Sequence, residues 1–308
     1  MEIVYAFVGR LPSYIVETIH QARLFSTGKI TLICDDIGSP FLEKIAKYNV
    51  NVVPYVSVID MEFLSCLNTH HGKFCIADKL GDRRLLFIRS FERFFLLQKY
   101  MEMTGATNVL FLELDVLIYF RPSDAISMFS KREISFEYAD KMQNCSGFCY
   151  IKSVDILNEM NKYFLNHIIH HPKEEFLSEM GAIKCWIKDP LIKSRVWMLP
   201  GLWKDERYSE DIWNAIEDFD NCLYDGAGIG ILVDGPDATH RKQWEEKGRV
   251  WWGTEVNYSE VPYLWKTIDG FRYLYLVDKK NNNKEYKVNC IHVHNKNLSL
   301  FLSRSLSG

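Results

Sequence analysis

The chain has 308 residues, of which 47% are hydrophobic and 25% are charged, and its formal net charge is −3. This near-neutral balance argues against a nucleic-acid-binding protein, whose binding surface is usually basic. No apolar run approaches the length of a transmembrane helix, so we expect no integral membrane segment. Eight cysteines without a CxxC pair, and no recognisable signal peptide, predict reduced thiols and a cytoplasmic location.

Strands and helices alternate over residues 1–122. We expect strands at Glu2–Gly9, Lys29–Asp36 and Val50–Val58, and helices at Pro12–Phe25, Ser39–Asn49 and Arg89–Gly105. This order predicts an α/β fold with a Rossmann-like, mostly parallel central sheet and right-handed crossovers. Ligands of such sheets bind at the carboxyl ends of the strands, and Gly9, Asp35 and Asp115 fall at or near those ends.

The segment Val109–Phe120 is apolar except for Glu113 and Asp115. We interpret it as one strand that is buried on both faces. Side chains two apart in a strand share a face, so both carboxylates could bind one hard cation such as Mn²⁺ or Mg²⁺. The alternative is a salt-bridged pair at the strand end, with Arg93 or Lys99 as partner. A glycosidase pair is disfavoured, because its carboxylates must flank a sugar from two sides.

The order of elements changes after Pro122. We expect strands in ISFEYAD and CSGFCYIK, helices at Ser153–His171 and Ser209–Phe219, and a last strand at Tyr286–Lys296. The polar run Val277–Lys287 predicts a hairpin loop. Strands and helices do not alternate regularly in this half. We expect it to form a mixed α/β region that builds the substrate site.

The last strand carries a second group of candidate ligands. His292 and His294 alternate along it, so both face the same side, and Lys296 follows them. A lone histidine is usually structural. For two histidines on one strand face followed by a lysine, a metal or anion site is as well supported as a structural role. We expect His294, nearer the strand end, to be the metal ligand and His292 to be its neighbour.

At this point the motifs resemble a known family. The acidic segment FLELDVLIYFRP is similar to the metal-binding strand of the GT-A-fold glycosyltransferases, in which an Asp-x-Asp (DXD) sequence ends a central strand. It is close in style to the strand of bacterial and large-DNA-virus sugar transferases, with Glu113 in place of the first aspartate. Six further motifs follow the order of that family: FVGRLPSYIVETIHQARLF, LICDD, ERFFLLQKYM, NCSGFCYIK, YDGAGIGILVDGPDATHR and IHVHNK.

The resemblance implies a GT-A fold in which residues 1–122 form the nucleotide-sugar-binding half and residues 123–308 the donor-sugar and acceptor half of one domain. It implies a UDP- or GDP-sugar donor and a divalent metal, with the metal held by Glu113, Asp115 and a C-terminal histidine. The residues implied to contact the donor are Phe7, Val8 and Gly9 at the base, Asp35 at the base or ribose, Arg93 and Lys296 at the phosphates, and Asn144, Ser146 and Gly147 at the sugar.

For catalysis, the resemblance places Asp225 near the transferred sugar and the acceptor. If configuration is inverted, Asp225 is the first candidate for the general base and Glu255 the second; if it is retained, Asp225 would stabilise an oxocarbenium-like state. The alternative for Asp225 is an Asp-Gly turn, and for Glu255 a surface position. Four tryptophans are candidates for either acceptor stacking or the core: Trp244, Trp251, Trp252 and Trp265.

These expectations define a metal-dependent hexosyl- or pentosyltransferase that moves a sugar to a glycan hydroxyl. A bacterial enzyme or a virus-encoded one in host cytoplasm would both fit. Two alternatives remain open: a hydrolase or nucleotidyltransferase on the same sheet, and a carbohydrate-binding protein without turnover. The charged segment His240–Arg249 is expected to be a solvated loop or a lid over the donor.

Overall fold

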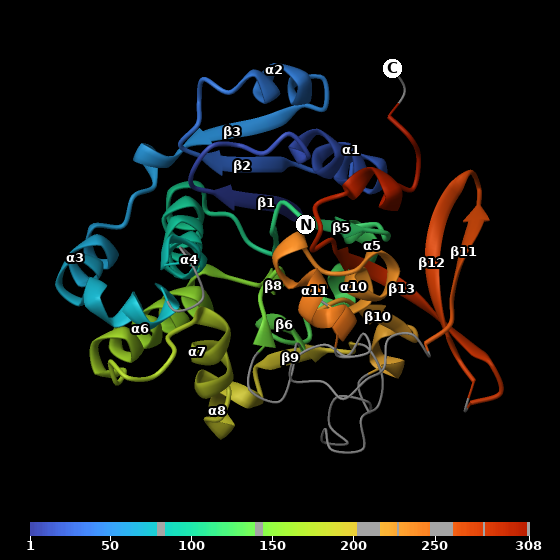
Figure 1. Ribbon diagram of the computed structural model, residues 1–308. Coiled ribbons are helices and arrows are strands. Elements are labelled where there is room, and N and C mark those ends of the chain that lie inside the picture. The colour runs from blue at the N-terminus through green and yellow to red at the C-terminus, as the bar shows by residue number, and fades with distance from the viewer. Residues whose placement is uncertain are drawn as a thin grey trace.

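The described residues of the computed structural model are 1–78, 84–138, 144–201, 216–226, 228–246, 261–279 and 281–306. They form a mixed α/β fold with a mostly parallel central sheet, helices on both of its faces, and a separate smaller sheet (Figure 1). The fold class predicted from the βα alternation is therefore confirmed.

The central sheet has the strand order β3-β2-β1-β4-β8-β6-β7, and β9 pairs with β6. Its first four strands are parallel: β1 (Glu2–Phe7), β2 (Ile30–Cys34), β3 (Val50–Pro54) and β4 (Val109–Leu112). Two more run in the same direction, and two run opposite to them: β6 (Ile134–Tyr138) and β9 (Val196–Leu199), against β7 (Asn144–Cys145) and β8 (Phe148–Ile151).

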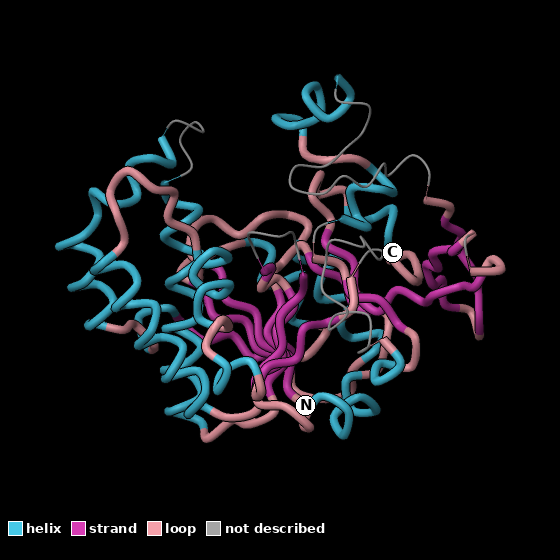
Figure 2. The backbone as a smooth tube through the Cα atoms, turned by 90° about the horizontal axis from the view of Figure 1, so that it is seen from below, coloured by secondary structure: helices cyan, strands magenta, loops and turns pink. Residues whose placement is uncertain are grey.

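The helices cover both faces of this sheet (Figure 2). The described α-helices are α1 (Ile15–Phe25), α2 (Pro40–Ala46), α3 (Met61–His70), α4 (Arg84–Thr104), α5 (Pro122–Phe129), α6 (Val154–His170), α7 (Glu179–Trp186), α8 (Pro190–Lys193), α10 (Gly228–Asp234) and α11 (Ala238–Glu246). Alternate residues of β1 enter two cores: Ile3 and Tyr5 pack with α1, and Val4 packs with α4 and α6. Because both faces are buried, these strands appear in the sequence as continuous apolar runs.

The second sheet is mostly antiparallel and contains β10 (Cys222–Tyr224), β13 (Lys284–His292), β12 (Phe271–Asp278), β11 (Tyr263–Ile268) and β5 (Val116–Ile118). The hairpin of β11 and β12 lies at the edge of the molecule away from α3 and α6 (Figure 1). The connection from β12 to β13 falls within Val277–Lys287, where the sequence predicts a hairpin loop.

The prediction of one strand over Val109–Phe120 is wrong. β4 ends at Leu112 and β5 begins at Val116, and the two strands belong to different sheets. A turn separates them, in which the Val116 N–H donates to the Glu113 carbonyl at 3.1 Å. The apolar run continues because both strands are buried, so its composition does not show where the chain leaves one sheet for the other.

The two halves of the chain are interleaved by this crossing. β5 precedes residue 122 but lies in the second sheet, and β6 to β9 follow it but lie in the first. Within the described residues, no helix combines the length and the apolar character needed to cross a bilayer. The predicted helix at Ser209–Phe219 falls mostly outside the described residues.

Candidate functional site

The two acids lie in the turn where the chain passes from β4 to β5. The Glu113 N–H donates to the Gly147 carbonyl at 2.8 Å, which ties the turn to the loop between β7 and β8. Asp115 is buried, whereas the Glu113 side chain is 23% exposed. The turn follows the carboxyl end of a parallel strand, the edge at which such sheets bind ligands.

His292 brings the two carboxylates together. Its Nε2 lies 3.2 Å from Asp115 Oδ2 and 3.4 Å from Glu113 Oε2. The end of β13 is paired with the start of β5, with His292 opposite Val116, so the histidine is held against the acid turn by strand pairing. One ligand atom from each of the three residues lies within 4.8 Å of the others. Two carboxylate oxygens and an imidazole nitrogen form a donor set suited to Mn²⁺.

Gly147 makes room for this histidine. A Cβ at this position would lie 3.3 Å from His292 Nδ1 and 3.3 Å from Val116 Cγ2, which is tighter than ordinary van der Waals contact. The glycine of the NCSGFCYIK motif therefore allows β8 and β13 to approach each other behind the acids.

His294 occupies a different position from the one expected for a ligand. Its ring stacks on His292, with centroids 4.5 Å apart and an interplanar angle of 21°. Burial, followed by the nearby charges of His292 and Lys296, lowers the pKa of His294 well below its usual value. Within the described residues, the cluster of possible ligands contains His292 and not His294. The assignment of His294 as a ligand remains a prediction.

Each acid also has a basic partner. Arg93 on α4 donates to Glu113, to Ser146 Oγ at 2.8 Å and to Glu179 Oε1 at 3.1 Å. Lys296, whose side chain is 44% exposed, pairs with Asp115. The salt-bridged alternative considered for the acid pair thus has a geometric basis with Arg93.

Lys99 takes no part in the site. It pairs with Glu102 at 3.1 Å, and its Nζ lies 3.5 Å from Asp60 Oδ2. The suggestion of Lys99 as partner of the acids is therefore wrong, because its side chain leaves α4 toward a different set of carboxylates.

The charges explain the titration of His292. Burial disfavours a charge on this imidazole, but Asp115 and Glu113 outweigh that effect and raise the pKa of His292 to about 9. Burial likewise opposes the charge on Asp115, and His292 and Lys296 hold its pKa well below the ordinary value. Without a metal, protonated His292 adds to the positive charge that Arg93 and Lys296 place beside the acids.

Asp225 lies behind His292 and is 1% exposed. Its carboxylate accepts hydrogen bonds from the N–H groups of Ile229 at 2.7 Å, Gly230 at 2.7 Å and His292 at 3.0 Å. It therefore caps the start of α10 and joins it to the end of β13. Burial raises the pKa of Asp225, although these hydrogen bonds oppose the rise. These are the contacts of a structural cap, and the catalytic role of Asp225 remains a prediction.

The predicted nucleotide-binding edge is formed by the ends of β1 and β2. The Gly9 N–H donates to Asp35 Oδ1 at 2.8 Å, and Gly9 has a φ of +125° that favours glycine. Phe7 and Val8 are half-buried beside it. Tyr14, at the start of α1, has its pKa raised by burial and by the charges of Asp115 and Glu113. Thr18 in the first turns of α1 also donates to the Leu114 carbonyl, so the start of α1 lies against the acid turn.

Asn144 and Ser146, both in the NCSGFCYIK motif, are buried. Ser146 accepts the hydrogen bond from Arg93. Asn144 is fully buried, and within the described part of the chain neither of its side-chain polar atoms has a hydrogen-bond partner. A buried amide in this state is costly unless a ligand or a water supplies the missing bonds.

Two acids of this region, Glu137 and Glu179, were not predicted from the sequence as site residues. Glu137 on β6 is fully buried; it accepts from the Phe148 N–H at 3.2 Å and from the Cys290 thiol at 3.0 Å, and burial raises its pKa to about 8. Glu179, at the start of α7, holds Arg93. An acid inside the mostly apolar strand Ile134–Tyr138 is the kind of signal that drew attention to Glu113 and Asp115, and it could have identified Glu137.

The remaining candidates are only partly described. Trp265 on β11 has its ring 6.3 Å from Tyr119 and 6.4 Å from Phe301, so it packs against the core. Residues up to 246 of the segment His240–Arg249 belong to α11. Four candidates lie outside the described residues or side chains: Glu255, Trp244, Trp251 and Trp252.

No protein-family model and no curated protein matches the chain. Solved structures similar to it include the glycosyltransferase GlyE of Streptococcus pneumoniae TIGR4, at 12% identity and a TM-score of 0.42, over 64% of this chain and 45% of that one. Mouse xyloside xylosyltransferase 1 is 8% identical with a TM-score of 0.41, over 71% and 93% of the two chains. A cytidylyltransferase of Leptospira borgpetersenii is 13% identical with a TM-score of 0.37, over 71% and 83%.

This chain therefore spans less than half the length of the pneumococcal protein. Likenesses at these identities and TM-scores carry no functional argument. The fold class rests on the strand order, and the function rests on the chemistry of the site.

Proposed function

We propose that the chain is a metal-dependent glycosyltransferase that moves a sugar from a nucleotide-diphosphate sugar to the hydroxyl of a glycan. The observation that carries this proposal is the cluster of Glu113, Asp115 and His292. It lies at the carboxyl edge of a parallel sheet, next to a loop with the expected nucleotide-binding residues. Bound there, Mn²⁺ or Mg²⁺ would neutralise the charge that develops on the departing diphosphate.

The site residues fit such an ion in number and in kind. His292 must lose its proton before its Nε2 can bind a metal, and the doubly charged ion then supplies the positive charge that the proton supplied. Asp115 and His292 are held by strand pairing and by burial, so they are the better fixed ligands. This proposal makes His292 the histidine ligand in place of His294, which stacks on it and would orient its ring.

The two basic residues have different roles in this proposal. Arg93 is buried and already has three partners, so it positions the Glu113 carboxylate. Lys296 is half exposed and has Asp115 as its partner, so it can pair with a donor phosphate once the metal takes Asp115. Replacing Lys296 by Met should raise the KM for the donor about tenfold, the loss of one charge-assisted bond.

The donor would lie along the carboxyl edge of the central sheet, from the ends of β1 and β2 to the loop between β7 and β8. Phe7, Val8, Gly9 and Asp35 would receive the base and ribose, as a UDP- or GDP-sugar requires. The sugar, a hexose or a pentose, would lie beside Asn144, Ser146 and Gly147. The unpaired amide of Asn144 supports this placement because sugar hydroxyls can supply its missing hydrogen bonds.

Catalysis of transfer would then depend on a base opposite the departing diphosphate. Asp225 or Glu255 would act as that base in an inverting reaction, and Asp225 would stabilise the positive sugar in a retaining one. A cytoplasmic location is part of the proposal. It is supported by seven cysteines that are free among those whose side chains are described.

The test measures the turnover of sugar-nucleotide donors as a function of added Mn²⁺. The stripped protein is titrated with Mn²⁺, and release of UDP or GDP from a panel of sugar nucleotides is followed with and without a glycan acceptor. We expect release that requires Mn²⁺ and increases with the acceptor. Replacing Asp155, an exposed acid in the first turn of α6, by Asn is the control and should change neither quantity.

Glu113 is paired with Arg93 and Asp115 with Lys296. These ion pairs favour a second candidate function, a carbohydrate-binding protein without turnover. In that case Arg93 and Lys296 would remain on the acids and no metal would be needed. Sugar binding that is unchanged by EDTA, together with no release of nucleotide, would support this candidate and reject the first. Release of nucleotide that ignores the acceptor would instead indicate the hydrolase alternative.

A further inference from the structure

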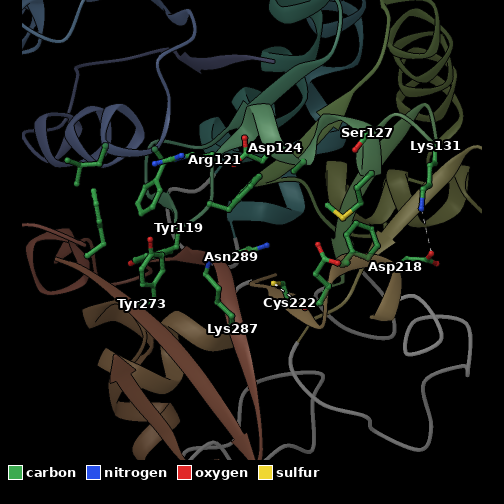
Figure 3. A pocket seen from close by; sticks show the side chains of 18 residues that line it. Tyr119, Arg121, Asp124, Ser127, Lys131, Asp218, Cys222, Tyr273, Lys287 and Asn289 are labelled. Atoms are coloured by element: carbon green, nitrogen blue, oxygen red, sulfur yellow. Dashed lines mark hydrogen bonds and ion pairs between the residues drawn. The ribbon is translucent and has the colours of Figure 1, made fainter. Parts of the chain in front are cut away.

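A cavity of about 630 Å³ lies on the opposite face of β13 from the acid cluster. Its lining comes from the end of α1, the residues after β5, α5, the region of β10, β12 and β13 (Figure 3). Lys287 and Asn289 of β13 line it, whereas none of the three residues of the acid cluster does. The cavity is therefore separate from the proposed metal site, and the proposed function does not use it.

A buried acceptor without a described partner lies in the wall of this cavity. Asn289 is 6% exposed, and its amide nitrogen donates to the Tyr224 hydroxyl at 3.1 Å. Its Oδ1 has no hydrogen-bond partner among the residues that the structure describes. Figure 3 shows Asn289 near Lys287 and Cys222 among the side chains that line the cavity. A ligand that offers a hydroxyl or amide hydrogen there would remove the cost of the unmade bond.

Two cations lie at the same end of the cavity. Lys287 Nζ is 4.5 Å from the centroid of the Tyr273 ring, and burial lowers the pKa of this amine. Arg121 lies close enough to Tyr273 for its charge to oppose the rise that burial causes in the pKa of that phenol. Neither cation forms a salt bridge within the described ranges. Lys131, at the other end, lies 3.9 Å from Asp218.

The acids of the cavity lie at its rim. Asp124, Asp218 and Asp220 are all exposed to solvent. The lining from β12 and β13 instead combines the half-buried Lys287 with the half-buried rings of Phe271 and Tyr273, and the exposed Arg121 lies near Tyr273. Positive charge beside flat apolar faces and a free carbonyl oxygen is complementary to a ring compound with an anionic group and hydroxyls.

We propose that this cavity binds an anionic saccharide independently of the metal site. Its phosphate or carboxylate would pair with Lys287 and Arg121, a ring hydroxyl would donate to Asn289 Oδ1, and the sugar ring would lie against Tyr273. The volume is within the range of roughly 300–1,000 Å³ that is typical of small-molecule sites.

The test is isothermal titration calorimetry of the full chain in EDTA, so that no metal-dependent donor binding contributes. The probes are glucose 6-phosphate and glucuronate, which carry the two kinds of anion, and neutral glucose and inorganic phosphate as comparisons. We expect one of the anionic sugars to bind with a Kd of about 1 mM or tighter, at least about tenfold tighter than glucose and phosphate. The anionic sugar that binds more tightly identifies the anion.

Variants locate the binding. Replacing Lys287 by Met should weaken it about tenfold or more, the effect of losing a charged hydrogen bond. Replacing Lys266 by Met is the matched control, because this lysine lies 4.8 Å from the Tyr275 ring on the same sheet but outside the cavity. Arg121→Gln, at an exposed position, repeats the test with a second cation of the lining.

Three results would overturn the proposal. They are the absence of binding by both anionic sugars, equal binding of glucose or phosphate, and equal affinity of the Lys287→Met and Arg121→Gln variants with the wild type. Because the calorimetry is done in EDTA, absence of saccharide binding would not argue against the proposed Mn²⁺-dependent transfer. Likewise, absence of nucleotide release would not argue against saccharide binding in this cavity.

Discussion

Two pairs of acids lie close together in this molecule, and they are held in different ways. Glu113 and Asp115 are paired with side chains, from Arg93, Lys296 and His292. Asp225 and Glu137 are fully buried and accept hydrogen bonds mainly from backbone N–H groups.

The difference shows which acids are able to exchange partners. Side-chain partners can move away when a metal or a phosphate arrives, whereas backbone N–H groups are fixed by the helices and strands that contain them. We therefore infer that the first pair binds ligands and that the second pair holds the first in place.

The largest effect is expected at Asp115. Replacing it by Asn should abolish Mn²⁺ binding and reduce transfer about 10³-fold, because metal stabilisation of the transition state is worth several kcal/mol. The measurement is kcat/KM with saturating Mn²⁺, and circular dichroism verifies that the variant is folded. A variant with wild-type turnover would show that Asp115 is merely a salt-bridge acid.

The Asp225→Ala change should act on stability. Three backbone N–H groups lose their acceptor, and each unsatisfied buried donor costs about 1–3 kcal/mol, so a loss of about 3 kcal/mol or more is expected. The measurement is the urea midpoint in EDTA. Asp225→Asn separates the two roles of this residue: a stable variant that binds donor but does not turn over would establish the predicted catalytic role.

Gly230→Ala tests whether α10 positions His292. A Cβ at Gly230 would collide with the His292 carbonyl, which is backbone and cannot rotate away. We expect a loss of about 1–3 kcal/mol in stability, as in an overpacked core, and weaker Mn²⁺ binding. Gly38→Ala is the control, because nothing lies within 4 Å of the position of its Cβ. Equal behaviour of the two variants would refute this role for α10.

The last prediction concerns pH. Burial raises the pKa of Glu137 from 4.5 to about 8, so the folded state retains a proton that the unfolded state has released. The free energy of unfolding should therefore fall as the pH rises from about 4.5 to about 8, and Glu137→Gln should remove this dependence. Urea midpoints at several pH values measure it.

Glu133 should contribute to the free energy of unfolding with the opposite pH dependence to Glu137, and Glu133→Gln tests this. Hydrogen bonds from Arg195 lower the pKa of Glu133, so this carboxylate stabilises the fold above its ordinary pKa and the stabilisation is lost in acid. A Glu137→Gln variant with the same pH profile as the wild type would contradict the role given to burial.

The sequence predicts the parallel half of the fold well because its strands are apolar runs between recognisable helices. It also brings Glu113, Asp115 and the IHVHNK motif into one hypothesis. It does not predict the turn between β4 and β5, since Val109–Leu112 and Val116–Ile118 are both buried and look like one strand. Nor does it predict the cap at Asp225, because the partners are backbone groups, one of them 67 residues away.

The central claim is that the acid pair exists to hold a divalent ion against a pyrophosphate. Anomalous scattering from crystals soaked with Mn²⁺ and a sugar nucleotide tests it most directly. We predict a peak within coordination distance of Asp115 and His292, with Lys296 moved from Asp115 toward a phosphate. A map without that peak, with Arg93 on Glu113 and Lys296 still on Asp115, would contradict the claim.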